Sequence, residues 1–147
     1  MGVNKIILSK ELLSTPCSSV TTLEGEAIAH TLMGILLESE TAIGLAANQI
    51  GINKRVCIVH VEQPIVLINP LIIAKKGSTL FKEGCLSFPG DEVTTQRYSY
   101  IEVASANHDQ ILIFSREKNL LECICVQHEI DHLNGITMHQ RRSMISG

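Results

Sequence analysis

Two histidines four positions apart, His128 and His132, constrain the fold of this chain more than any other feature of its sequence. They fall in residues 120–133, where helical spacing also places Leu121, Ile124 and Cys125 on the same stripe. Because residues four apart share one face of a helix, both imidazoles can bind the same metal ion. Glu129 is offset around the helix and can reach a water on that metal without being a ligand. We therefore predict a metal-binding helix over residues 120–133.

A catalytic metal site needs a third protein ligand and an open position for water or substrate. Cys85 is the best candidate, because it lies away from the helix and its neighbour Gly84 permits close approach. A thiolate with two imidazoles suits zinc or ferrous iron. The alternative for Cys85 is a buried free thiol. The odd number of cysteines, five, shows no disulfide pattern.

The remaining histidines have no ligand spacing. We expect them to be surface or structural residues: His30, His60, His108 and His139.

The rest of the chain predicts an α+β fold. Residues 22–39 have the apolar spacing of an amphipathic helix with Thr21 or Thr22 as its N-cap. Residues 41–51 are small and almost uncharged and are expected to form a loop. Strands are expected at segments rich in β-branched residues, 56–61, 65–74, 100–106 and 111–115, with a hairpin turn at 107–110. This order predicts a single domain over residues 1–147, with mostly antiparallel sheets packed around the central metal-binding helix and an N-terminal helix.

Composition and charge exclude several classes of function. With 45% hydrophobic and 18% charged residues, the chain is typical of a globular domain. A net charge of −3 gives no phosphate-binding surface, so no nucleic-acid partner is expected. The run Ile6-Ile7-Leu8 is far too short for a signal peptide or a membrane span, and Ile6 stands where a myristoylation signal has Ser or Thr. We expect a monomer in a bacterial-type cytoplasm or an organelle, without a membrane partner.

Three segments, in this order, resemble those of the peptide deformylase family. Glu83-Gly84-Cys85-Leu86-Ser87 and the segment from Gln127 to Leu133 match the family's Glu-Gly-Cys-Leu-Ser and Gln-His-Glu-x-Asp-His-Leu fully. Residues 42–49 match Gly-x-Gly-x-Ala-Ala-x-Gln except at Ala42, where the family has glycine. The added methyl group is expected to be tolerated. The resemblance extends from the N-terminal helix to about Gly135.

The resemblance implies a metal-dependent hydrolase that removes the N-formyl group from N-formylmethionyl peptides and gives formate and a free N-terminal methionine. It implies one divalent metal, Fe2+ in the cell with Zn2+, Ni2+ or Co2+ able to replace it. The implied ligands are Cys85, His128 and His132. Glu129 would transfer the proton, and the Gln49 side chain and the Leu86 N–H would stabilise the oxyanion.

The resemblance also implies a substrate-binding site. Its apolar members, expected to hold the methionine side chain, are Ile43, Phe81, Leu121, Ile124 and Cys125. Gly44 and Glu83 would meet the substrate backbone or fix the metal site. The alternative is that the apolar residues of the helix only form part of the hydrophobic core and no pocket. Many bacterial members continue into a long C-terminal helix that helps to dock on the ribosome; this chain ends at Gly147, fifteen residues after His132, so docking through such a helix is not expected.

Two other functions stay open from the residues alone. A metallopeptidase would use the same histidine spacing, although a thiolate as third ligand is unusual for that class. A non-catalytic metal or thiol redox module would need a closed site of four ligands or a Cys-x-x-Cys pair. The sequence offers no clear fourth ligand, and Cys123 and Cys125 are separated by one residue.

Overall fold

The computed structural model describes residue 6 and residues 9–144 of the chain. Its helices are α1 (Lys10–Leu13), α2 (Thr22–Glu38) and α3 (Arg116–Leu133), with short 3-10 helices η1 (Ala47–Ile50) and η2 (Met138–Arg141). Its strands are β1 (Gly44–Ala46), β2 (Val56–His60), β3 (Pro64–Ile68), β4 (Leu71–Lys76), β5 (Thr79–Glu83), β6 (Val93–Arg97), β7 (Tyr100–Ala104) and β8 (Leu112–Ser115).

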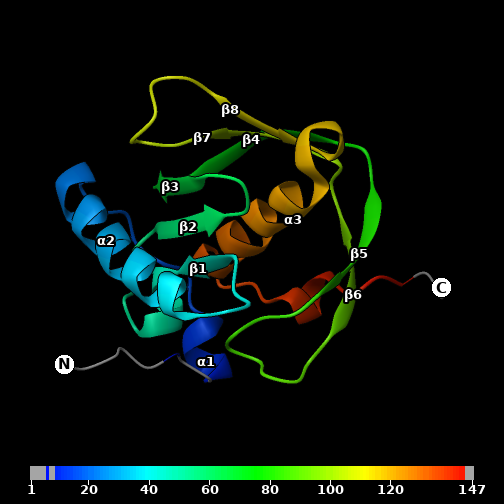
Figure 1. Cartoon of the computed structure of the whole chain (residues 1–147), viewed down its shortest axis with the longest axis horizontal. Coiled ribbons are helices and arrows are strands. Elements are labelled where there is room, and N and C mark those ends of the chain that lie inside the picture. Colours follow the sequence, from blue (N-terminus) through cyan, green and yellow to red (C-terminus); the bar gives the residue numbers. More distant parts are fainter. Residues whose placement is uncertain (1–5, 7–8, 145–147) are drawn as a thin grey trace.

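The strands form three sheets, ordered β1-β2-β3, β4-β7-β8 and β5-β6, and neighbours within each sheet are antiparallel. Figure 1 shows α3 crossing the middle of the molecule, with the first sheet on one side of it and the β5-β6 hairpin on the other. The α2 helix covers the opposite face of the first sheet. The predicted α+β fold with sheets around a central helix is therefore confirmed.

The first sheet divides the hydrophobic core in two because its side chains alternate between faces. On β2, Cys57 and Val59 belong to the cluster that packs against α3. The intervening Val56 and Ile58 belong to the cluster beneath α2. This strand is buried on both faces, and it therefore fixes the position of α3 relative to the rest of the fold.

The central helix has a break near its N-terminus. Asn119 has non-helical backbone angles (φ −169°, ψ 106°), and its side chain accepts a 3.0 Å hydrogen bond from the Glu122 N–H. Asn119 thus caps the regular part of α3, which begins where the sequence predicts it. The residues from Cys123 to Leu133 are all buried. Gly135, with φ 76°, follows the helix in the left-handed conformation expected of it.

Two expectations about local structure were wrong, and one hairpin was not predicted. The strand predicted over residues 65–74 is two strands, β3 and β4, because Asn69 has φ 50° and is followed by Pro70. The Asn69 side chain holds this turn by hydrogen bonds with the backbone N–H and C=O of Val20, at 3.1 and 2.8 Å. The segment 41–51, expected to be a loop, contains β1 and η1, and the hairpin β5-β6 was not predicted.

Two residues of the apolar run at positions 6–8, residues 7 and 8, lie outside the described residues. Of the helices in residues 9–144, none has the length and the apolar composition that a membrane span requires.

Candidate metal centre

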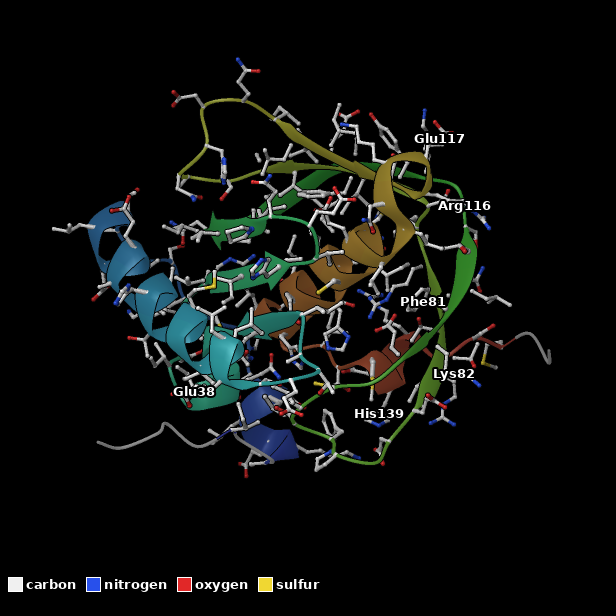
Figure 2. All side chains as sticks on the ribbon, in the orientation of Figure 1. Glu38, Phe81, Lys82, Arg116, Glu117 and His139 are labelled. Atoms are coloured by element: carbon white, nitrogen blue, oxygen red, sulfur yellow. The ribbon has the colours of Figure 1, made fainter. Side chains whose placement is uncertain are left out.

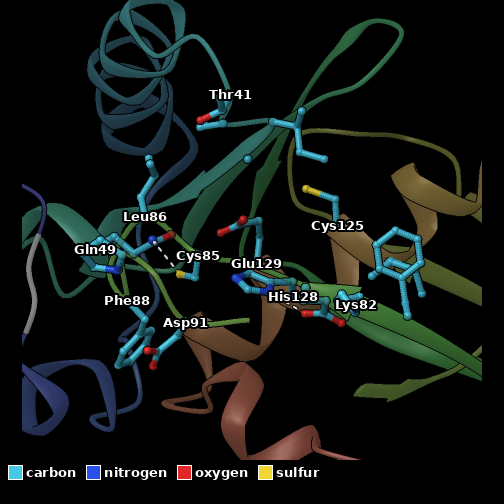
Figure 3. Close-up of a pocket in the computed structure, with 18 of the residues that line it drawn as sticks. Thr41, Gln49, Lys82, Cys85, Leu86, Phe88, Asp91, Cys125, His128 and Glu129 are labelled. Atoms are coloured by element: carbon cyan, nitrogen blue, oxygen red, sulfur yellow. Dashed lines mark hydrogen bonds and ion pairs between the residues drawn. The ribbon is translucent and has the colours of Figure 1, made fainter. Parts of the chain in front are cut away.

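The predicted metal ligands come from two elements far apart in the sequence. Cys85 follows β5 closely, whereas His128 and His132 lie one turn apart on α3. One ligand atom from each lies within 4.8 Å of the other two. Cys85 Sγ is 3.4 Å from His132 Nε2. Figure 3 shows Cys85 beside the His128 ring. The structure thus brings together three side chains that could hold one metal ion.

A buried carboxylate beside these side chains has an unsatisfied oxygen. Among the residues that the structure describes, Oε1 of Glu129 has no hydrogen-bond partner, although Glu129 is only 4% exposed. Leaving such an atom unpaired costs about 1–3 kcal/mol, or more when it is charged. A water or a substrate group in the site would satisfy it. This oxygen and the Cys/His/His donor set fit a metal with an open coordination position.

Glu83 orients one of the histidines. Its Oε1 is 2.7 Å from Nδ1 of His128, which leaves Nε2 of that ring free for a ligand. Arg97 holds the same carboxylate from Nε and Nη2, at 2.6 and 2.8 Å, and Thr95 donates its hydroxyl to Oε2. Burial alone would raise the pKa of Glu83, but hydrogen bonds from Arg97 and His128 lower it to about 2. Glu83 was expected to meet the substrate backbone or to fix the metal site. Both oxygens of its carboxylate are engaged by protein groups, which favours the second role.

A second carboxylate extends this network behind the helix. Asp131 pairs with Arg97 Nη1 at 2.5 Å and with Arg141 of η2 at 2.9 Å. Arg97 is 3% exposed in its side chain, so it is a buried cation between two buried carboxylates. The sequence prediction missed Arg97 and Arg141. Arg97 is a lone arginine in a polar strand, and Arg141 lies in a short polar segment after the histidine motif, so neither carries a signal of a buried ion pair. Asp131 lies inside the histidine motif, and this second acidic residue there could have indicated a buried partner.

Burial raises the pKa of Glu129 to about 7, against the opposing effect of His128. Near neutral pH this group can therefore both accept and release a proton. The backbone of β1 approaches this carboxylate closely, because a Cβ built on Gly44 would lie 2.7 Å from Glu129 Oε2 and 2.6 Å from Cys125 Sγ. Only glycine therefore fits at position 44.

These residues border a cleft of about 480 Å³. All seven predicted substrate-binding residues line it: Ile43, Gly44, Phe81, Glu83, Leu121, Ile124 and Cys125. Glu129, Gln49, Leu86 and Cys85 line it as well, whereas His132, 1% exposed, is not among its lining residues.

Gln49 presents its amide nitrogen to the metal centre. Its Oε1 accepts a 2.9 Å hydrogen bond from the Ala46 N–H, which fixes the side chain. Its Nε2 is then 3.5 Å from Cys85 Sγ and 3.2 Å from Ser87 Oγ. Figure 3 shows Gln49 and Leu86 on the same side of Cys85. The Gln49 side chain and the segment that carries Leu86 thus meet beside Cys85.

The sequence of this chain is similar to those of known proteins over nearly its whole length. The family model described as polypeptide deformylase matches residues 4–146. A peptide deformylase of Buchnera aphidicola is 37% identical over 128 residues, which cover 84% of this chain and 75% of that protein. One from Desulfitobacterium hafniense is 46% identical over 101 residues, which cover 68% and 67%.

Solved structures agree with these sequence matches. A peptide deformylase of Synechococcus elongatus in complex with actinonin has a TM-score of 0.83 and 32% identity, covering 95% of this chain and 78% of that one. A class I type b enzyme of Acinetobacter baumannii with Met-Ala-Ser bound has a TM-score of 0.84 and 26% identity, covering 96% and 100%. The matches extend over both parts of the candidate site, the segment around Cys85 and the helix α3. This chain therefore belongs to the polypeptide deformylase family.

Proposed function

We propose that this chain removes the N-formyl group from N-formylmethionyl peptides through the residues that meet in the cleft. The observation that carries this proposal is the convergence of Cys85, His128 and His132 beside the unsatisfied Oε1 of Glu129. A metal-dependent amide hydrolase needs a metal ligand set and a nearby proton acceptor in one partly enclosed site, and the cleft offers both.

The metal would be held by Cys85, His128 and His132. A divalent ion bound there would lower the pKa of a bound water and would polarise the formyl carbonyl. The family resemblance favours Fe2+ in the cell, and the thiolate-imidazole donor set also accepts Zn2+, Ni2+ or Co2+. Glu83 keeps the His128 ring oriented for this role through its hydrogen bond to Nδ1.

The other side chains of the site act on the proton and on the developing charge. Glu129 accepts a proton from the attacking water at Oε1 and passes it to the departing amine nitrogen. The Nε2 group of Gln49 and the backbone N–H of Leu86 donate to the formyl oxygen as it becomes negative. Because Gln49 is held by Ala46, its donor is already in place before the reaction.

The apolar part of the cleft suits the methionine side chain. Phe81, Leu121 and Ile124 line it beside Cys125, on α3 and on the strand β5 that precedes Cys85. The similar Acinetobacter baumannii enzyme binds Met-Ala-Ser, a peptide that begins with methionine. We propose that this chain binds nascent formyl-Met peptides in the same way. A single domain over residues 1–147, acting as a monomer, stays a prediction.

Formate release tests the proposal. Protein prepared without oxygen and loaded with Fe2+, Ni2+ or Co2+ should release formate from formyl-Met-Ala-Ser and should leave unformylated Met-Ala-Ser intact. Cleavage of the unformylated peptide would indicate the metallopeptidase instead. No turnover with any of the three metals would refute both hydrolase functions.

Changing Gly44 to alanine is expected to reduce kcat/KM about 100-fold, the effect of displacing a catalytic group by about 1 Å. The new methyl group would overlap Glu129 Oε2 and Cys125 Sγ. Steady-state formate release measures the loss. Gly34→Ala is the matched control, because no atom of the described part of the chain lies within 4 Å of a Cβ at Gly34 on α2. This control should keep full activity, and full activity in Gly44→Ala would contradict the close approach.

A further inference from the structure

One wall of the cleft is a short turn segment, residues 88–91, which follows Cys85. Phe88, Pro89, Gly90 and Asp91 all line the cleft. In Figure 3, Phe88 and Asp91 lie on one side of Cys85, and Cys125 lies on the other. Two successive turns form this segment, with the Phe88 N–H donating to the Cys85 carbonyl and the Asp91 N–H to that of Phe88, both at 3.0 Å.

A histidine from the C-terminal part of the chain ties this wall to the fold. His139 Nε2 is 2.9 Å from Asp91 Oδ2. The His139 ring also meets the Phe88 ring edge to face, with centroids 4.6 Å apart and an angle of 77°. Figure 2 shows His139 on η2, close to the loop that carries the wall. One side chain thus makes a polar and an aromatic contact with the same four-residue wall.

The short helix η2, which carries His139, is tied to buried residues and to β6. Met138, the neighbour of His139 on η2, is 1% exposed. Arg141 pairs with the buried Asp131, and the Ser143 N–H donates to the Thr94 carbonyl of β6 at 2.9 Å. The wall, by contrast, is exposed at Pro89, Gly90 and Asp91. Because η2 is tied to the core and residues 89–91 are exposed, we expect His139 to hold the turn in place.

We infer that His139 is a positioning residue that sets how the cleft binds the peptide beyond its formyl-methionine, an inference that rests on the proposed function. The formyl group would lie at Cys85, Glu129 and Gln49. The methionine side chain would extend toward Cys125. The remaining peptide then has the wall of residues 88–91 as a neighbour. His139 touches no reacting atom and acts through Phe88 and Asp91.

The test compares two substrates that share the formyl-methionine. His139→Ala is expected to raise KM for formyl-Met-Ala-Ser about five- to tenfold, the effect of losing one hydrogen bond and its packing. Formylmethionine amide is too short to reach the wall of residues 88–91, so its KM should be unchanged. For both substrates kcat should be unchanged, and so should the visible absorption spectrum of the Co2+-loaded protein, which reports the metal ligands.

Further variants keep the test independent of folding. Asp91→Asn changes an exposed group and should reproduce part of the KM increase. His139→Asp combined with Asp91→His rebuilds the hydrogen bond in reverse and should restore KM toward the original value. His108→Ala removes a histidine that contacts the Val66 carbonyl, between the first and second sheets, and should leave both substrates unaffected.

The outcomes separate this inference from the proposed function. If the unmodified protein released no formate, the function itself would be wrong. If it released formate but His139→Ala left KM for the tripeptide unchanged, the positioning role would be wrong. Equal losses on both substrates, or a changed Co2+ spectrum, would also overturn it, because His139 would then support the metal site.

Discussion

Replacement of Glu129 by glutamine is expected to lower kcat for formate release about 10²–10⁴-fold, the usual contribution of a positioned acid-base group. Glutamine has nearly the same shape, so the packing against Gly44 and Cys125 should remain. Its amide cannot accept the proton of the attacking water at the position of Oε1. The metal should stay bound, because Cys85, His128 and His132 are unchanged.

The measurement combines formate release with metal content and the Co2+ spectrum of anaerobically prepared protein. Glu117→Gln is the matched control, because it makes the same change on the same helix at an exposed position (Figure 2). It should be indistinguishable from the unmodified protein. Full activity of Glu129→Gln with metal bound would contradict the proton-transfer role, whereas metal loss would show that the carboxylate supports the ligands.

The metal site was largely predictable from the sequence because two of its three candidate ligands lie close together in the chain. His128 and His132 share a helix, and helical spacing alone places them on one face. Cys85 is 43 positions before His128, and no periodicity connects them; its small neighbour and its suitability as a ligand made it a candidate. Only the fold could show that the hairpin β5-β6 brings it to within 3.4 Å of His132.

The network behind the ligands could not be predicted, because it depends on pairings between elements. Arg97 ends a strand of polar appearance, and its burial follows from the packing of the hairpin on α3. The same strand alternates buried and exposed residues, Val93, Thr95 and Arg97 being buried. Because two of the three buried residues, Thr95 and Arg97, are polar, a search for alternating apolar residues does not detect this strand. For a related reason the break at Asn69 was missed, since its turn is stabilised by the distant Val20.

Arg97→Met is expected to destabilise the protein by about 3–5 kcal/mol, the effect of removing one partner from a buried charge network. Methionine keeps most of the volume but leaves the carboxylates of Glu83 and Asp131 without their shared cation. Urea unfolding of the metal-free protein measures this loss. Arg141→Met is the matched control, because Arg141 pairs with the same Asp131 but has a side chain that is 42% exposed. A half-exposed ion pair contributes only about 0–1 kcal/mol.

The two arginines should also differ in their effect on the metal. Arg97 contacts Glu83, which orients His128, so its loss should weaken metal affinity about 10–100-fold, as for other residues that hold a ligand in place. Arg141 contacts only the far carboxylate and should leave affinity unchanged. Competition with a chelator, measured on Co2+-loaded protein under conditions where both variants are folded, separates these effects. Equal affinities in Arg97→Met and the unmodified protein would show that Glu83 orients His128 without help from Arg97.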